Sequence, residues 1–266
     1  MMKTDLPTED LNPQTSSAKL PWNPWWAVLF VIVVYFLSQL IGQLAVSLYP
    51  QLQHWSPTQT EQWLSSSLWA QFFYVCIAEA FTVWALWFFL NYFTQRKVNW
   101  QAIGLRRPRW SDPLAGLAML VPYFITYIAV FNVCQKLFPH LDVNQTQQLG
   151  FDNVAGVGPL IVTFISLVIL PPFVEELLVR GFLYTTLRGY IPKLLAALVA
   201  SAIFASGHLQ FGSGAPLLWI AFIDTFILSL FLIFLREKTK GLYASMTLHA
   251  LKNFIAFMSL FIFHVH

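Results

Sequence analysis

Polar side chains that could carry out hydrolysis interrupt three otherwise apolar stretches of the sequence. In chain order they are Glu175, Glu176, Arg180, His208, His249 and Asn253. An ionisable group in the middle of a bilayer costs about 3 kcal/mol or more, so it is by default interpreted as functional and paired. Carboxylates and imidazoles exchange protons with a reacting water, and an amide donates a hydrogen bond to an oxyanion. These residue types therefore predict a hydrolytic site.

The first group combines two carboxylates with one arginine. Glu176 and Arg180 are four residues apart, so on a helix they share a face and suit an ion pair. Glu175 lies about 100° further round the helix and points elsewhere. One arginine leaves one of the two carboxylates without full compensation, which suits a general base. The alternative is that all three residues form a buried ion network that only fixes helix packing.

The other two groups carry the imidazoles. Phe204 and His208 share one helix face, and His249 and Asn253 share another. Small residues at 201–206 let helices approach closely, which would bring His208 within reach of a carboxylate on another helix. Taken alone, His208 is more often a satisfied interhelical histidine than a catalytic group. Asn253 either donates to a developing oxyanion or holds the imidazole tautomer.

The composition places these groups in a membrane protein. Hydrophobic residues make up 57% of the 266 residues and charged residues only 10%, with a mean hydropathy of +0.61. A soluble domain carries about 25% charged residues. The net charge of +3 is small and carried mostly by loops, so nucleic acid is not an expected partner. Cys76 and Cys134 lie in apolar runs without metal-ligand spacing and are expected to be free thiols.

A membrane-spanning helix needs about 20 apolar residues. We expect seven, at 25–48, 67–93, 113–138, 157–187, 193–210, 215–235 and 241–263. Pro171-Pro172 predicts a kink or break in the fourth, which is either one bent span or a span followed by an in-plane helix. The predicted fold is all-α, a polytopic membrane helix bundle of seven or eight helices. Residues 1–24 are expected to form a flexible cytoplasmic tail and 25–266 the transmembrane domain, with the polar motifs in 170–255.

Basic residues alternate between the loops. Lys and Arg are absent from the loops at 49–66, 139–156 and 211–214 and present in the loops between them. The positive-inside rule then predicts a multi-pass integral membrane protein with a cytoplasmic N-terminus, in the inner membrane if the source is prokaryotic. At 1.5 Å per residue, the three polar groups lie roughly 14 to 22 Å from their nearest basic loops. This common depth predicts one shared site near the midplane.

Three further polar residues in the spans have weaker interpretations. Glu79 and Asp224 lack a partner at helical spacing, so structural or cavity-lining roles are expected. Lys252 is expected to snorkel to the interface or to line the same cavity as His249.

The three groups resemble the motifs of the CPBP family of intramembrane proteases, also called CAAX-protease or Abi proteins. That family carries E-E-x-x-x-R, F-x-x-x-H and H-x-x-x-N on successive helices, and the matches stand in this order within about residues 170–255. The matching residues are Glu175-Glu176…Arg180, Phe204…His208 and His249…Asn253. The resemblance implies an endopeptidase that cuts a peptide or membrane-protein substrate at or within the membrane.

The resemblance also implies a role for each residue. Glu175 would activate water, aided by His208, while His249 and Asn253 would stabilise the oxyanion. Glu176 and Arg180 would support this arrangement.

The family has also been described as metalloproteases. The candidate ligands Glu175, His208 and His249 could hold Zn²⁺ with one open position. The sequence has no H-E-x-x-H motif, and if Glu175 were a ligand then Glu176 would have to act as base while pairing with Arg180. We therefore favour metal-independent hydrolysis with no cofactor, with Zn²⁺ as the alternative.

Two other classes of function stay open at this point. Similar proteins are associated with bacteriocin processing and self-protection, so a non-catalytic membrane scaffold or bacteriocin-immunity protein is the main alternative. A transporter with a Glu/His proton relay is the second, although the two halves show no paired broken helices. The expected partners are membrane lipids and a peptide or membrane-protein substrate.

Overall fold

The computed structural model describes residues 22–93, 100–142, 145, 150–151, 154–210 and 216–264. Residues 1–21 of the predicted tail lie outside this part, as do 94–99 and 211–214 of two predicted loops and residue 215 at the start of the sixth predicted span. Every regular element within the described residues is helical, which confirms the all-α membrane helix bundle.

Most of the predicted spans are present as helices. The long ones are α1 (Pro24–Leu52), α3 (Leu68–Phe88), α4 (Ser111–Leu137), α9 (Trp219–Thr239) and α10 (Tyr243–Phe257). The segments α5 (Val157–Phe164), α6 (Leu170–Glu175) and α7 (Thr185–Arg188) join through π-helical turns at Ile165–Ile169 and Glu176–Tyr184. Together they form one helical rod, 32 residues long. Within the described residues, six helices including this rod are long and apolar enough to cross a membrane.

The fifth predicted span is shorter than expected. Helix α8 (Lys193–Ser206) has 14 residues and ends before the predicted limit at residue 210. Its last turn tightens because the backbone N–H groups of Gly207 and His208 bond to carbonyls three residues back. Hydropathy could not show this end, because the turn itself is still apolar.

The extra helix lies elsewhere than predicted. No break follows Pro171-Pro172, since the rod continues to Arg188. Instead, α2 (Pro57–Ser66) forms in the predicted loop at 49–66. Ser56 caps this helix and exchanges hydrogen bonds with Gln59, while Pro57 supplies a backbone already suited to the first turn.

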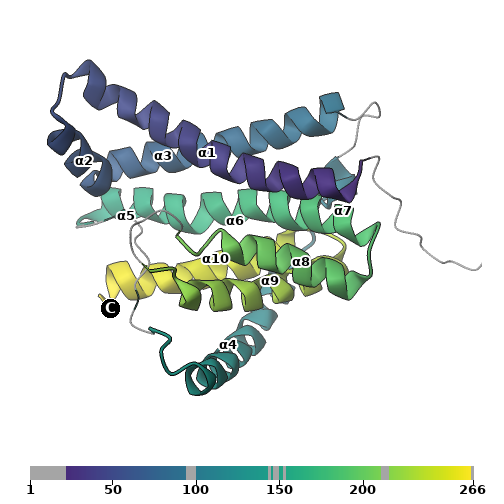
Figure 1. Cartoon of the computed structure of the whole chain (residues 1–266). Helices are drawn as coiled ribbons and strands as arrows, with labels where there is room; N and C mark the ends of the chain where they lie inside the picture. The colour runs from purple at the N-terminus through teal and green to yellow at the C-terminus, as the bar shows by residue number, and fades with distance from the viewer. Residues whose placement is uncertain are drawn as a thin grey trace, which may run out of the picture.

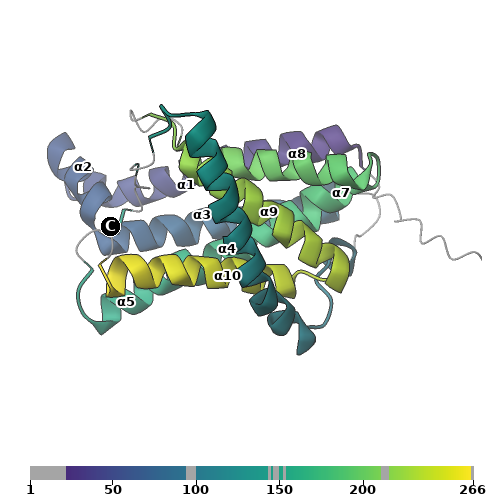
Figure 2. The ribbon, with the colours of Figure 1, turned by 90° about the horizontal axis from the view of Figure 1, so that it is seen from below.

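The rod lies in the middle of the bundle (Figure 1). Helices α1 and α3 pack on one side of it, and α8, α9 and α10 pack on the other. Helix α4 crosses the outer face of α9 and α10, as Figure 2 shows from below. All nine residues of Glu176–Tyr184 are buried, so the segment with the acidic motif is the best-packed part of the rod.

Basic residues gather at one end of the bundle, here called the basic end. The buried Glu237 forms ion pairs there with Arg188, Lys193 and Lys240, at 3.1, 3.4 and 3.5 Å. Arg106 donates to the Thr239 carbonyl at 3.0 Å at the same end. These contacts tie the ends of α7, α8 and α9 to the loop before α4, and explain why α9 extends past the predicted limit at residue 235.

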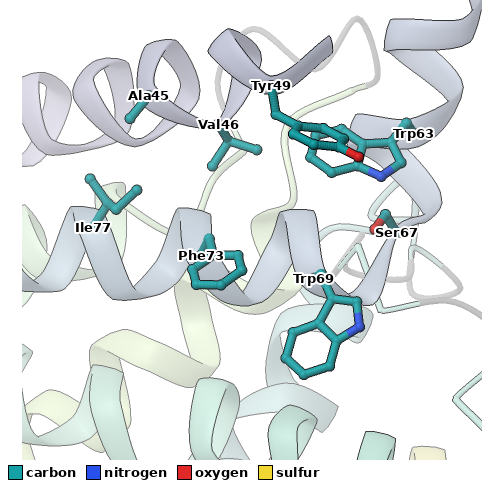
Figure 3. Close-up of a pocket in the computed structure, with 8 residues that line it drawn as sticks. All are labelled: Ala45, Val46, Tyr49, Trp63, Ser67, Trp69, Phe73 and Ile77. Carbon is teal, nitrogen blue, oxygen red and sulfur yellow. The ribbon is translucent and has the colours of Figure 1, made fainter. Parts of the chain in front are cut away.

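The opposite end of the bundle carries an aromatic cavity of ≈ 400 Å³ between α1, α2 and α3 (Figure 3). The rings of Tyr49 and Trp63 pack 5.2 Å apart over it. Its lining contains none of the six polar residues singled out in the sequence.

Candidate active site

Four of the six predicted residues line one cavity. Glu175 from the rod, His208 from the end of α8, and His249 and Asn253 from α10 border a space of ≈ 410 Å³. The structure thus brings side chains of all three motifs to the border of one cavity. Glu176 and Arg180 lie behind the cavity wall, each with 0% of its side chain exposed.

The buried pair behind the wall has the predicted geometry. Arg180 Nη1 donates to Glu176 Oε1 at 2.9 Å, across four residues of the rod. The guanidinium carbon also lies 4.3 Å from the centre of the Phe204 ring, where a cation is attracted by the ring face. Glu176 Oε2 and the Nε and Nη2 atoms of Arg180 are buried without a hydrogen-bond partner among the described residues. Ordered water is the usual partner for such atoms.

Glu176 also holds the histidine of the third motif. His249 Nδ1 lies 3.2 Å from Glu176 Oε1, and the imidazole is almost fully buried. The sequence-based alternative, in which Asn253 holds the His249 tautomer, is not what the geometry shows. A carboxylate from another helix takes that place, and residue spacing along one helix could not reveal it.

Glu175 faces the cavity, whereas its neighbour does not. Its side chain is 29% exposed, and Oε2 lies 3.6 Å from His249 Nε2. His249 thus lies between two carboxylates, one buried and one facing the cavity. The sequence predicted that one carboxylate pairs with Arg180 while the charge of the other is less compensated. Glu176 is the paired carboxylate, and Glu175 is the less compensated one.

The backbone of α8 orients His208. Its Nδ1 lies 3.1 Å from the Phe204 carbonyl oxygen. A carbonyl only accepts hydrogen bonds, so this contact assigns the proton to Nδ1 and leaves a lone pair on Nε2 of the neutral ring. The Phe204 ring packs edge-on against both imidazoles, with centroids 4.9 Å from His208 and 5.9 Å from His249.

Tyr35 on α1 also supports this part of the site. Its hydroxyl donates to the Gly207 carbonyl at 2.6 Å, directly before His208. Tyr35 also lines a second cavity of ≈ 280 Å³, whose mainly apolar wall includes Glu175 and His208. No sequence pattern pointed to Tyr35, because it lies 172 residues from its partner in an ordinary apolar span.

Asn253 is fixed by a carbonyl of the rod. Its Nδ2 donates to the Leu167 oxygen at 3.0 Å. Pro171 stands four residues after Leu167 and Pro172 five, so neither the α-helical nor the π-helical donor for that oxygen exists. The expected break is absent, since the rod continues through the two prolines with π-helical turns before them and this side-chain donor at the Leu167 carbonyl.

Asp224 does have a partner, contrary to the expectation from spacing. Lys252 Nζ lies 2.9 Å from Asp224 Oδ2, and Lys252 lines the same cavity as His249. Of the two roles expected for Lys252, the structure supports lining the cavity. Glu79 makes no hydrogen bond or ion pair with another described residue.

The candidate metal ligands do not assemble into a metal site. Within the part of the chain that the structure describes, no group of three or more His, Cys, Asp and Glu side chains is placed to hold an ion. Glu175 and His249 instead contact each other, while His208 is bound to its own helix. The residues present therefore do not fit the Zn²⁺ alternative in this arrangement.

Comparison with known proteins supports the resemblance drawn from the motifs. No curated protein and no solved structure matches the chain. Residues 157–255 match the family model described as type II CAAX prenyl endopeptidase Rce1-like. The matched segment contains all six predicted site residues and the whole rod up to Arg188. Residues 157–255 of this membrane protein are thus similar to the Rce1-like family of CAAX prenyl endopeptidases.

Proposed function

We propose that the protein is an intramembrane endopeptidase that hydrolyses a peptide bond of a membrane-associated protein or peptide. The observation that carries the proposal is the position of Glu175. Its carboxylate faces a cavity between helices, and both His208 and His249 line the same wall. A carboxylate beside two imidazoles in a water-poor site is suited to activating water.

The arrangement supports a sequence of proton transfers. Glu175 takes a proton from a water molecule whose oxygen attacks the carbonyl carbon, while the free Nε2 of His208 accepts a hydrogen bond from the O–H that this water keeps. Glu175 then passes its proton to His249 Nε2, 3.6 Å away, and Glu176 compensates the imidazolium from the other side. The imidazolium and the Asn253 amide stabilise the oxyanion. The C–N bond breaks, and the proton on His249 goes to the leaving amine.

The second cavity gives an apolar substrate group a place beside the reacting atoms. Val31, Ile32 and Phe36 of α1 and Ile203 of α8 form much of its wall. The two cavities share Glu175 and His208, so a peptide in one and an apolar group in the other would meet at the proposed catalytic carboxylate.

We also propose that the basic end faces the cytoplasm, with the N-terminus on that side. Trp22 at the start of the described chain donates to Thr186 Oγ1 at 2.9 Å, next to Arg188. Positive residues gather on the cytoplasmic side of membrane proteins. Reporter fusions at residue 22 and in the loop before α2 should report opposite sides of the membrane.

A cleavage assay with the full chain in lipid nanodiscs tests the proposed activity. We expect the wild-type protein to cleave a lipid-modified fluorogenic CAAX peptide, and Glu175→Gln to lose more than about 10²-fold in rate. Glu61→Gln, on the exposed face of α2, is the matched control and should keep the wild-type rate. Full activity of Glu175→Gln would overturn the proposed mechanism. Complementation of a deletion strain by that variant would favour the scaffold or immunity role instead.

A further inference from the structure

A second ion pair stands in the wall of the catalytic cavity and takes no part in the mechanism above. Lys252 Nζ lies 2.9 Å from Asp224 Oδ2, with 24% of the lysine side chain and 16% of the aspartate side chain exposed. The Tyr123 hydroxyl donates to the other oxygen of Asp224. The carboxylate is therefore held from α4 and α10 together, and it fixes the position of the ammonium group.

Lys252, rather than its partner Asp224, borders the cavity. Lys252 lines this space with Glu175 and His249, whereas Asp224 is absent from its lining. An ammonium carries three N–H donors, and the contact with Asp224 leaves others to point into the cavity. Lys252 follows His249 by three residues on α10, which places their Cβ atoms about 5–6 Å apart. A group bound by Lys252 would thus lie close to the scissile bond.

The charges in the cavity favour one kind of ligand at Lys252. Glu176 is compensated by Arg180 behind the wall, so Glu175 is the carboxylate that faces the substrate. A substrate carboxylate would be repelled near Glu175 and attracted near Lys252. Water-poor surroundings strengthen both the repulsion by Glu175 and the attraction by Lys252. Charge-assisted hydrogen bonds between ammonium and carboxylate groups are also among the strongest in proteins.

Stability alone does not account for the pair. Replacing a buried ion pair by well-packed apolar residues is often neutral or stabilising. An ionisable pair within membrane helices is therefore interpreted as functional by default. Water activation uses Glu175 and His208, and oxyanion stabilisation uses His249 and Asn253, which leaves substrate recognition for Lys252.

We propose that Lys252 binds the free terminal carboxylate of the substrate peptide, with Asp224 and Tyr123 as positioning residues. The inference rests on the proposed peptidase function and adds a specificity-determining residue to it. It predicts an enzyme that selects peptide ends over internal segments of similar sequence.

Two peptides that differ only at their end test the inference. One lipid-modified fluorogenic CAAX peptide carries a free C-terminal carboxylate, and its twin carries a terminal amide. Binding of both to full-length Glu175→Gln in nanodiscs is measured without cleavage, and cleavage of both is measured with the wild type. We expect the acid to bind and to be cleaved at least about tenfold better, mainly through KM.

Variants at the pair separate recognition from folding. Lys252→Met should bring the acid-to-amide ratio close to one, and Lys252→Arg, which keeps the charge, should preserve the preference. Because Lys252→Met leaves Asp224 unpaired, Lys252→Met with Asp224→Asn removes both charges and should fold while showing the same loss of preference.

The outcomes distinguish the inference from the proposed function. Equal binding of acid and amide, or no binding of either, overturns the inference, as does an unchanged preference in the double variant. Acid-selective binding without cleavage by the wild type overturns the peptidase function and leaves Lys252 as an anchor for carboxylate-bearing chains.

Discussion

The amide of Asn253 occupies the hydrogen-bonding position that Pro171 leaves open at the Leu167 carbonyl. The distance from Nδ2 to the carbonyl oxygen is 3.0 Å. A helix would normally satisfy this oxygen from within, and the two consecutive prolines remove both backbone donors. The missing helical hydrogen bond in the rod thus holds the Asn253 side chain of α10 in place, close to His249.

This relationship predicts a loss of activity without a loss of stability. In Pro171→Ala, the new backbone N–H bonds to the Leu167 oxygen and displaces Asn253. We expect a fall in kcat of about tenfold, below the 10²–10³-fold typical of losing an oxyanion donor. The thermal midpoint should stay the same or rise, since the helix gains a hydrogen bond. Cleavage rates in nanodiscs measure the change in kcat, and thermal unfolding in nanodiscs measures the change in the midpoint.

A variant of Asn253 itself provides a further comparison. Asn253→Ala should lower kcat by at least as much as Pro171→Ala, and combining the two changes should add little, because both act through one amide. Additive losses in the double variant would show that Pro171 does not act through Asn253.

The local part of this site follows from sequence, and the part between helices does not. Helical spacing predicted the ion pair of Glu176 with Arg180, because residues four apart share a face. The partners of His249, Asn253 and Asp224 lie on other helices, so they depend on how the helices pack. The π-helical turns and the early end of α8 also escaped prediction, since both keep the same apolar composition as their surroundings.

The buried pair of Glu176 and Arg180 should be necessary for stability. Glu176→Gln leaves the fully buried guanidinium without its counter-ion, and breaking a buried pair in this way costs about 3–5 kcal/mol. We expect a strongly lowered unfolding midpoint in a denaturation series with mixed micelles. A midpoint close to that of the wild type would contradict the assignment of this pair.

Removing both charges separates folding from chemistry. Glu176→Leu with Arg180→Met should recover much of the stability, because no charge is left unpaired. It should nevertheless stay inactive, since His249 loses the acceptor 3.2 Å from its Nδ1. Recovered activity would mean that His249 needs no carboxylate to orient it.

The hydroxyl of Tyr35 should affect catalysis through His208. Tyr35→Phe removes the 2.6 Å hydrogen bond to the Gly207 carbonyl, a change of about 1 kcal/mol for an ordinary hydrogen bond. We expect a several-fold lower kcat with little change in KM, because the variant keeps the ring in the second cavity. Tyr49→Phe, at a half-exposed ring in the aromatic cavity, is the matched control. Equal rates for the two variants would assign Tyr35 to packing alone.

Removal of metal tests the choice between metal-independent and Zn²⁺-dependent hydrolysis. If Glu175 were a metal ligand, Glu176 would have to act as the base, but Glu176 is fully buried and already pairs with Arg180 and His249. We expect activity to survive dialysis against a strong chelator, while a zinc protease treated in parallel loses its activity. Elemental analysis of the dialysed protein verifies that metal has been removed. If activity disappeared and Zn²⁺ restored it, Glu175, His208 and His249 would have to rearrange into a ligand set, and the proton path through His249 would be wrong.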